Sequence, residues 1–210
     1  MIRILLVDDH PVVRCGIRTI LLDKFKDAAV AEAGDAHSAL LEVQQSDWDV
    51  VLLDISLPGP SGLDLIKHLR RHHPALPLVV VSMHPAAQFA RRALSAGALG
   101  YLTKDSPPEE FVAAIEQTRR GRRYVSRDTN DMLLRWKDTA ASTPHDTLSD
   151  REYQVLRLLG SGRTVSDVAR ALGLSVKTVS TYRTRVLDKL GMRTNAELMR
   201  YAIENSLLDS

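Results

Sequence analysis

The fold prediction rests on the stretch Val50-Val51-Leu52-Leu53-Asp54. Four consecutive apolar residues cannot alternate between a buried face and a solvated face, so they predict a strand that is covered on both sides in a parallel sheet. The run ends on a carboxylate. Groups just beyond the carboxyl ends of strands line the ligand crevice of open α/β sheets. Asp54 is therefore a candidate functional residue, although a lone aspartate can also simply end a strand.

Alternating strands and helices extend from this stretch in both directions. Apolar runs predict further strands at 2–7, 28–33, 76–81 and 99–102. Segments with apolar residues at helical spacing separate them, and these predicted helices begin at Pro11, after Asp35, after Gly62, at about Ala86 and at Pro107. Five βα units predict a doubly wound, five-stranded parallel sheet of the flavodoxin-like type.

Polar and charged residues follow the predicted strands at the same edge of this sheet. Asp8 and Asp9 follow the first strand, Asp54 the third, Ser82 the fourth, and Lys104 the fifth. Clustered carboxylates with few other ligands suit Mg²⁺, which prefers oxygen and keeps several waters. A carboxylate beside such an ion can act as the nucleophile toward a phosphoryl group, while the lysine offsets charge on the transferring oxygens. The strand ends thus predict an aspartyl-phosphate site.

The motifs at these strand ends resemble those of a known family. Residues 1–120 are similar to the receiver domain of two-component response regulators, through Leu6-Val7-Asp8-Asp9-His10, Leu53-Asp54-Ile55-Ser56-Leu57-Pro58-Gly59, Val81-Ser82-Met83-His84 and Gly100-Tyr101-Leu102-Thr103-Lys104-Asp105. The resemblance implies that a sensor histidine kinase phosphorylates Asp54. It also implies a role for each of the other residues.

The implied metal site consists of Asp8, Asp9, Asp54 and the backbone carbonyl of Ser56, and the implied cofactor is Mg²⁺. Ser82 and Lys104 would contact the phosphoryl oxygens. Tyr101 matches the switch aromatic, whose rotation accompanies an inward movement of Ser82.

Residues beyond 121 change in character. A short helix is possible within 125–136, and 137–147 has the polar composition of a linker. Capping boxes then predict helices that begin at Ser149, Thr164 and Thr194, and Ser175 caps one more. A short helix, a glycine-containing turn and a longer polar helix form the helix-turn-helix pattern.

This region also resembles a known family. The matching residues are Leu148-Ser149-Asp150-Arg151-Glu152, Gly162, Val168-Ala169, Leu174-Ser175-Val176-Lys177-Thr178-Val179, Lys189-Leu190-Gly191 and Ala196-Glu197-Leu198, and they look like the LuxR-type helix-turn-helix. The whole chain is thus similar to response regulators of the NarL/FixJ class. We expect a receiver domain at 1–121, a linker at 122–146 and a DNA-binding domain at 147–210.

The third helix of this domain is the predicted reader of double-stranded DNA. With Val179 and Val186 facing inward, Ser180, Thr181 and Thr184 are free to enter the major groove. The residues better placed for phosphates are Lys177, Thr178, Arg183, Arg185 and Lys189. A basic run by itself would equally fit a solvated face, so this prediction depends on the motif.

Composition sets the remaining expectations. The 210 residues carry a net charge of +2 and are 44% hydrophobic, with no apolar run of membrane-spanning length and no signal-peptide pattern. We therefore expect a soluble cytoplasmic protein. The leading interpretation is a transcription regulator, not an enzyme, that forms a homodimer when phosphorylated and binds paired half-sites in promoters.

Two alternatives remain open at this point. One is a regulator that works by constitutive dimerisation without phosphorylation. The other is a phosphatase with an aspartate nucleophile, but such enzymes usually carry a second aspartate two residues later, where this chain has Ser56.

Overall fold

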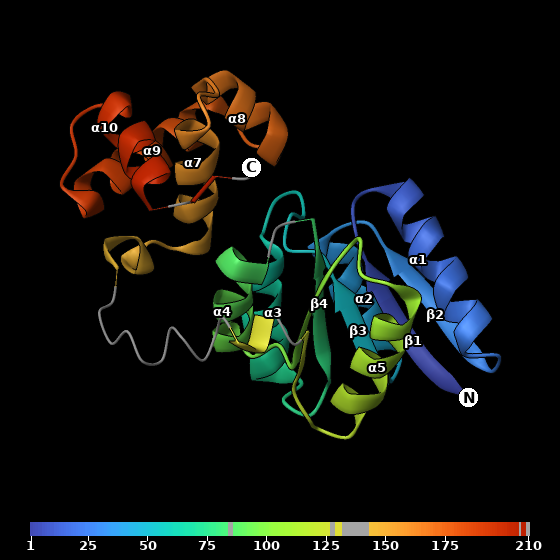
Figure 1. Ribbon diagram of the computed structural model, residues 1–210. Helices are drawn as coiled ribbons and strands as arrows, with labels where there is room; N and C mark the ends of the chain where they lie inside the picture. The colour runs from blue at the N-terminus through green and yellow to red at the C-terminus, as the bar shows by residue number, and fades with distance from the viewer. Residues whose placement is uncertain (84–85, 127–128, 132–142, 206, 209–210) are drawn as a thin grey trace. The chain divides into compact units, whose positions relative to one another are not determined.

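The computed structural model of the chain, shown in Figure 1, describes residues 1–83, 86–126, 129–131, 143–205 and 207–208. It divides into two compact units, residues 1–138 and 139–210. No helix among the described residues is long and apolar enough to cross a membrane.

The first unit alternates strands and helices around a parallel sheet. Its elements are β1 (Ile2–Val7), α1 (Pro11–Lys24), β2 (Ala28–Ala33), α2 (Ala36–Gln45), β3 (Val50–Leu53), α3 (Gly62–His72), β4 (Leu78–Ser82), α4 (Ala86–Ala96), β5 (Gly100–Thr103), α5 (Pro108–Arg119) and β6 (Tyr124–Val125). The strand order is β2-β1-β3-β4-β5-β6, and all of the pairs are parallel. The predicted doubly wound parallel sheet is confirmed.

The predicted number of strands is wrong by one. Tyr124 and Val125 form a sixth strand, which pairs with Gly100 and Tyr101 of β5. Two residues are too few to show the alternation or the apolar run from which a strand can be predicted. The short helix considered for 125–136 includes helical residues at 129–131, and 132–136 lie outside the described residues.

The sheet is covered on both faces, as the sequence of β3 requires. All four β3 residues have no exposed surface. α1 and α5 pack on one face and contribute Ile17, Leu21 and Phe111 to its core, while α2, α3 and α4 cover the other face (Figure 1). This double cover leaves the carboxyl edge of the strands as the place where polar side chains gather.

The second unit is helical. It contains the short 3₁₀ helix η1 (Pro144–Thr147), α7 (Asp150–Gly160), α8 (Val165–Leu172), α9 (Val176–Leu190) and α10 (Asn195–Glu204). The side chains of Ser149, Thr164 and Thr194 cap α7, α8 and α10 in capping boxes, and Ser175 caps α9, as predicted. α8 ends at Gly173, which takes the left-handed conformation at φ 63° that glycine adopts most easily.

Candidate functional site

The structure brings the predicted acidic residues together at the carboxyl edge of the sheet. β1 and β3 are neighbours, with Val7 opposite Leu53, so the residues that follow them, Asp8 and Asp54, lie side by side. Ligand atoms of Asp8, Asp9, His10 and Asp54 all lie within 4.8 Å of one another. Both Asp8 and Asp54 are buried.

Lys104 joins this cluster from β5, which lies two strands from β3 in the sheet. It follows β5, and its Nζ lies 2.6 Å from Asp8 Oδ2 and 2.8 Å from Asp54 Oδ2. The other carboxylate oxygen of Asp54 accepts a hydrogen bond from the amide of Ser56 at 3.1 Å. Asp54 is therefore held by a cation on one oxygen and by the backbone on the other.

Burial and the Asp54–Lys104 interaction shift the pKa of each of these two residues in opposite directions. Burial raises the pKa of Asp54, and nearby Asp8 acts in the same direction; Lys104 and the Ser56 amide offset this only in part. Burial by itself would lower the pKa of Lys104, but the two carboxylates outweigh it and raise that pKa. One ammonium thus faces two carboxylates, and negative charge remains to be neutralised.

The donor set fits Mg²⁺. Asp9 Oδ1 is buried and makes no hydrogen bond within the described part of the chain, although it lies 2.7 Å from His10 Nδ1. Carboxylate oxygens from Asp8, Asp9 and Asp54, gathered on neighbouring strand ends, are the ligands that this ion prefers. The structure thus supplies both the oxygen donors and the uncompensated charge that a magnesium site needs.

Ser82 and Tyr101 lie on the strands next to this cluster. Ser82 ends β4, Tyr101 lies in β5, and both side chains are buried. The backbone carbonyl of Ser82 accepts a hydrogen bond from the Lys104 amide at 2.9 Å, which fixes the two strand ends to each other. Every residue predicted for the phosphorylation site therefore lies at or next to one edge of the sheet.

Two residues of this edge had no role assigned from the sequence. The amide of His10 donates to Asp8 Oδ1 at 2.8 Å. Because His10 directly follows two aspartates, the sequence could have indicated that it belongs to this site. Arg14 donates to the backbone carbonyl of Asp8 from within α1. No feature of the sequence points to that contact, because Arg14 occupies an ordinary polar position of an amphipathic helix.

α9 carries the residues predicted to bind DNA. Val179 and Val186 are buried, and Ser180, Thr181 and Thr184 are exposed, as the helical period predicts. Lys177 and Arg185 are exposed as well. The predicted division of this helix into an inner and an outer face is confirmed.

The hydroxyl groups on this face already donate to the helix backbone. Ser180 donates to the Val176 carbonyl at 2.9 Å, Thr181 to that of Lys177 at 3.0 Å, and Thr184 to that of Ser180 at 3.1 Å. In this arrangement each hydroxyl presents its lone pairs outward. The outer face of α9 therefore offers acceptors to any group that approaches it.

Three of the predicted phosphate-contacting residues are engaged within the second unit. Lys189 Nζ lies 2.6 Å from Glu152 Oε2, and Arg183 Nε donates to Asn195 Oδ1 at 2.5 Å. The hydroxyl of Thr178 lies 2.8 Å from Ser175 Oγ at the start of the helix. Lys177 and Arg185 are thus the basic residues of α9 best placed to meet a ligand.

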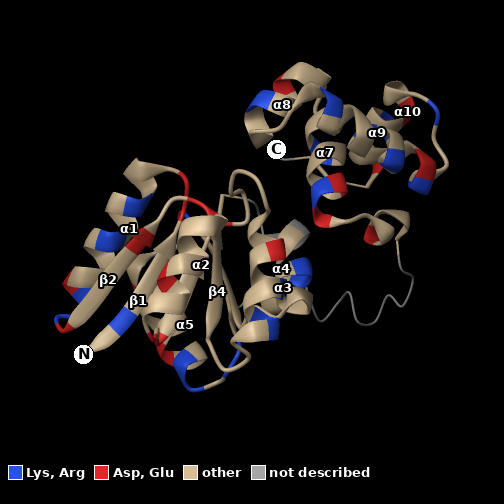
Figure 2. Cartoon of the chain, turned by 180° about the vertical axis from the view of Figure 1, so that it is seen from behind, with Lys and Arg blue, Asp and Glu red and all other residues tan. Residues whose placement is uncertain are grey.

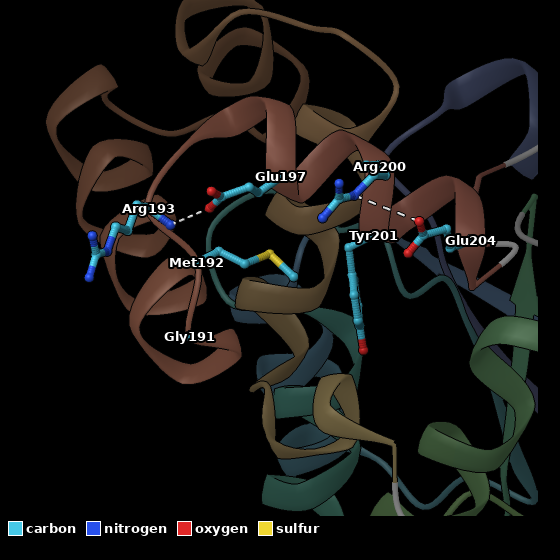
Figure 3. Close-up of a pocket in the computed structure, with 7 residues that line it drawn as sticks. All are labelled: Gly191, Met192, Arg193, Glu197, Arg200, Tyr201 and Glu204. Atoms are coloured by element: carbon cyan, nitrogen blue, oxygen red, sulfur yellow. Dashed lines mark hydrogen bonds and ion pairs between the residues drawn. The ribbon is translucent and has the colours of Figure 1, made fainter.

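A hollow between the end of α9 and α10 differs from this face in charge (Figure 3). Its lining residues are Gly191, Met192, Arg193, Glu197, Arg200, Tyr201 and Glu204. Glu197 accepts from the amide of Arg193 at 2.6 Å, and Arg200 pairs with Glu204 at 3.7 Å. The two arginines are balanced by two glutamates, so this hollow does not present the positive surface that a phosphate backbone needs.

The fold and the two sites together define a class of protein. Residues 4–116 match the response regulator receiver domain, and residues 146–202 match the bacterial regulatory proteins of the luxR family. The chain belongs to the two-component response regulators of the NarL/FixJ class, in which a receiver domain is followed by a LuxR-type DNA-binding domain.

Its relatives are similar over the full length. The chain is 34% identical to the response regulator UvrY of Escherichia coli K12 over 212 residues, which cover 100% of this chain and 97% of UvrY. It is 36% identical to the response regulator GacA of Pseudomonas protegens over 211 residues, which cover 100% and 99%.

Solved structures of RcsB are similar as well. RcsB from Salmonella enterica serovar Typhimurium, bound to the promoter rprA in the presence of the phosphomimetic BeF₃⁻, matches with a TM-score of 0.64 and 26% identity over 95% of this chain and 97% of that one. An RcsB–DNA complex matches with a TM-score of 0.60 and 27% identity, over 95% of this chain and 96% of that one.

Proposed function

We propose that the chain is a transcription regulator whose DNA binding is switched by phosphorylation of Asp54. The observation that carries this proposal is the position of Lys104, which contacts Asp54 and Asp8 at once at the carboxyl edge of the sheet. In this proposal residues 1–121 form the receiver domain, 122–146 the linker and 147–210 the DNA-binding domain.

The proposed chemistry is a phosphoryl transfer to the Asp54 carboxylate. An oxygen of Asp54 attacks phosphorus in the phosphohistidine of a sensor histidine kinase; the new O–P bond forms as the P–N bond breaks, and its electron pair returns to the imidazole. Bound Mg²⁺ would neutralise part of the negative charge on the phosphoryl oxygens. The residues that would hold it are Asp8, Asp9, Asp54 and Ser56, the last through its backbone carbonyl. Lys104 is close enough to pair with a phosphoryl oxygen on Asp54.

Ser82 and Tyr101 are the proposed sensors of the phosphoryl group. Both are buried on β4 and β5, beside the strand end that carries Lys104. A hydroxyl at Ser82 can donate to a phosphoryl oxygen. Closely packed cores change between discrete arrangements rather than deforming continuously. A small movement of Ser82 or Tyr101 can therefore favour one packed arrangement of the receiver domain over another.

α9 is the proposed reader of DNA, and a homodimer is the proposed binding form. Lys177 and Arg185 are placed for phosphates, and Ser180, Thr181 and Thr184 for base edges. One recognition helix contacts one half-site, and two copies bind half-sites about one helical turn apart. The similarity to RcsB, whose structures include complexes with DNA, supports this proposal.

The test is phosphorylation by a small phosphodonor with Mg²⁺, followed by mass spectrometry of the intact protein. Wild type should gain one phosphoryl group, and Asp54→Asn should gain none because an amide is a poor nucleophile. Asp47→Asn, at an exposed aspartate that precedes β3, is the matched control and should be labelled like wild type.

Undiminished labelling of Asp54→Asn would contradict the assignment of the acceptor. Absence of labelling in wild type, with DNA binding intact, would instead favour a regulator that dimerises without phosphorylation.

A further inference from the structure

Arg14 connects the acidic edge of the receiver domain to β2. Its side chain lies mostly buried in α1, and one terminal nitrogen of the guanidinium donates to the backbone carbonyl of Asp8. The Nε of the same guanidinium donates to Glu32 Oε2 on β2 at 3.0 Å. One planar group thus holds the loop after β1 and the edge strand of the sheet together.

The carbonyl that Arg14 contacts is part of the peptide that joins the two aspartates. Because a peptide unit is planar, its oxygen, the Cα of Asp8 and the Cα of Asp9 lie in one plane. Fixing the oxygen therefore fixes the rotation of this plane, from which both carboxylates project. On the other side of Asp8, the backbone amide donates to the Ala33 carbonyl at 3.0 Å.

Glu32 keeps the guanidinium in its orientation. An arginine fork presents its donors in fixed directions, so a carboxylate on Nε determines where the remaining N–H groups point. Glu32 also pairs with the Nε of Arg18, one turn further along α1, at 3.4 Å. Arg18 shares this partner, and within the described part of the chain the contact with the Asp8 carbonyl comes from Arg14.

We propose that Arg14 is a positioning residue for the magnesium site, which it serves by holding the Asp8–Asp9 peptide in the orientation that directs both carboxylates to the ion. This inference rests on the proposed function of Asp8 and Asp9. Arg14 does not touch the ion; it acts through the backbone of its ligands, and such outer partners change metal affinity by about 10- to 100-fold when they are removed.

The test measures metal binding directly, with Mn²⁺ as the probe and its free signal in electron paramagnetic resonance as the readout. Arg14→Met keeps most of the side-chain volume and removes every donor, and it should weaken Mn²⁺ binding by about 10-fold or more. Arg18→Met is the matched control, since Arg18 pairs with Glu32 as Arg14 does but does not contact the Asp8 carbonyl within the described residues. Its Mn²⁺ affinity should lie within about twofold of that of wild type.

Phosphorylation by a small phosphodonor gives a second readout that a purely structural role would not produce. Arg14→Met should require a higher Mg²⁺ concentration for half-maximal rate, by the same factor as for Mn²⁺, and should recover most of the wild-type rate at saturating Mg²⁺. Arg14→Lys, the less disruptive variant, keeps the charge but has no fork, and its Mn²⁺ affinity should fall between those of wild type and Arg14→Met.

Equal Mn²⁺ affinity in wild type and in both Arg14 variants would overturn the role of Arg14 and leave the proposed function standing. An equal loss in Arg18→Met and Arg14→Met would overturn it as well, because the contact with Asp8 would then not matter. A wild type that binds no Mn²⁺ would overturn this inference together with the proposed metal site.

Discussion

Gly62 is the residue at which the start of α3 meets the backbone of Asp54. A Cβ at this position would lie 2.0 Å from the Asp54 carbonyl oxygen and 2.7 Å from the Ile55 Cα. The Gly62 amide donates to the Ile55 carbonyl at 2.9 Å, so the close approach is part of the turn that follows β3. Only glycine allows this approach without moving the backbone of Asp54 and Ile55.

We therefore predict that Gly62→Ala lowers both stability and the rate of Asp54 phosphorylation. Overpacking of this kind costs about 1–3 kcal/mol in the free energy of unfolding. Urea unfolding and phosphodonor labelling are the measurements. Unchanged labelling in Gly62→Ala would contradict the prediction.

Gly16→Ala is the matched control for this variant. Gly16 lies within α1, and a Cβ added there would meet no atom of the described residues within 4 Å. Alanine at this helical position should add about 0.5–1 kcal/mol of stability.

Glu152 and Lys189 determine how the second unit responds to acid. Burial alone would raise the pKa of Glu152, but the hydrogen bond from Lys189 and those from Ser149 outweigh it and lower this pKa below its ordinary value of 4.5. A carboxylate with a lowered folded-state pKa stabilises the fold above its unfolded-state pKa, and this stabilisation is lost as the pH falls through the folded value.

We predict that the stability of residues 139–210 falls as the pH drops below about 4.5 and that Lys189→Met makes this dependence weaker. At pH 7 the same variant should lose about 1–3 kcal/mol in the free energy of unfolding, because the buried Glu152 carboxylate loses a charged hydrogen-bond partner. Arg185→Met, on the exposed face of α9, should change the free energy of unfolding by less than about 0.5 kcal/mol. Equal losses in the two variants, measured by urea unfolding, would rule out the assigned role of this ion pair.

At the scale of elements, α9 separates contacts that set affinity from contacts that set sequence preference. We predict that Arg185→Ala weakens binding to all DNA sequences alike and lowers the slope of log affinity against log salt by about one, as one lost phosphate contact requires. Thr184→Ala should leave the slope unchanged and alter which base pairs are tolerated. Binding selection from a random DNA library at several salt concentrations measures both, and identical profiles for the two variants would contradict this division.

The outer face of α9 could be predicted from sequence, because the buried Val179 and Val186 fix the orientation of a regular helix. The internal partners of Lys189 and Arg183 could not. Glu152 lies 37 residues from Lys189, and Asn195 lies 12 residues from Arg183. Local periodicity carries no information about such pairs, which exist only once α7, α9 and α10 have packed together.

The same distinction holds in the first unit. The strand ends that carry Asp8, Asp54 and Lys104 could be placed because parallel strands bring their carboxyl ends to one edge of the sheet. The Arg14 contact and the strand β6 could not be predicted, since one depends on a side chain reaching a backbone atom and the other on two residues with no pattern of their own.

For the whole molecule, the division into two compact units, shown with its charged residues in Figure 2, allows their functions to be tested separately. If the receiver domain restrains the second unit until Asp54 is phosphorylated, a fragment of residues 139–210 should bind DNA without phosphorylation. Full-length protein should bind less tightly than this fragment and gain affinity when phosphorylated, because the phosphoryl group can shift the equilibrium only by favouring one of two states.

Fluorescence anisotropy on one operator, with fragment, unmodified protein and phosphoprotein, measures this directly. Equal affinity of all three would exclude both restraint and phosphorylation-driven pairing. A fragment that binds more weakly than the unmodified protein, with the phosphoprotein strongest, would exclude restraint and leave pairing.

The strand β6 has a consequence for the length of chain that connects the two units. Among the described residues it pairs with β5 at two positions, one of which joins Val125 to Tyr101, and the chain leaves the sheet directly after it. A strand this short is the part of a sheet that opens at the smallest free-energy cost. Each residue released from β5 adds about 3.3 Å of chain to the connection. The length of this connection, and with it the effective concentration that it sets for the two units, therefore depends on the pairing beside Tyr101.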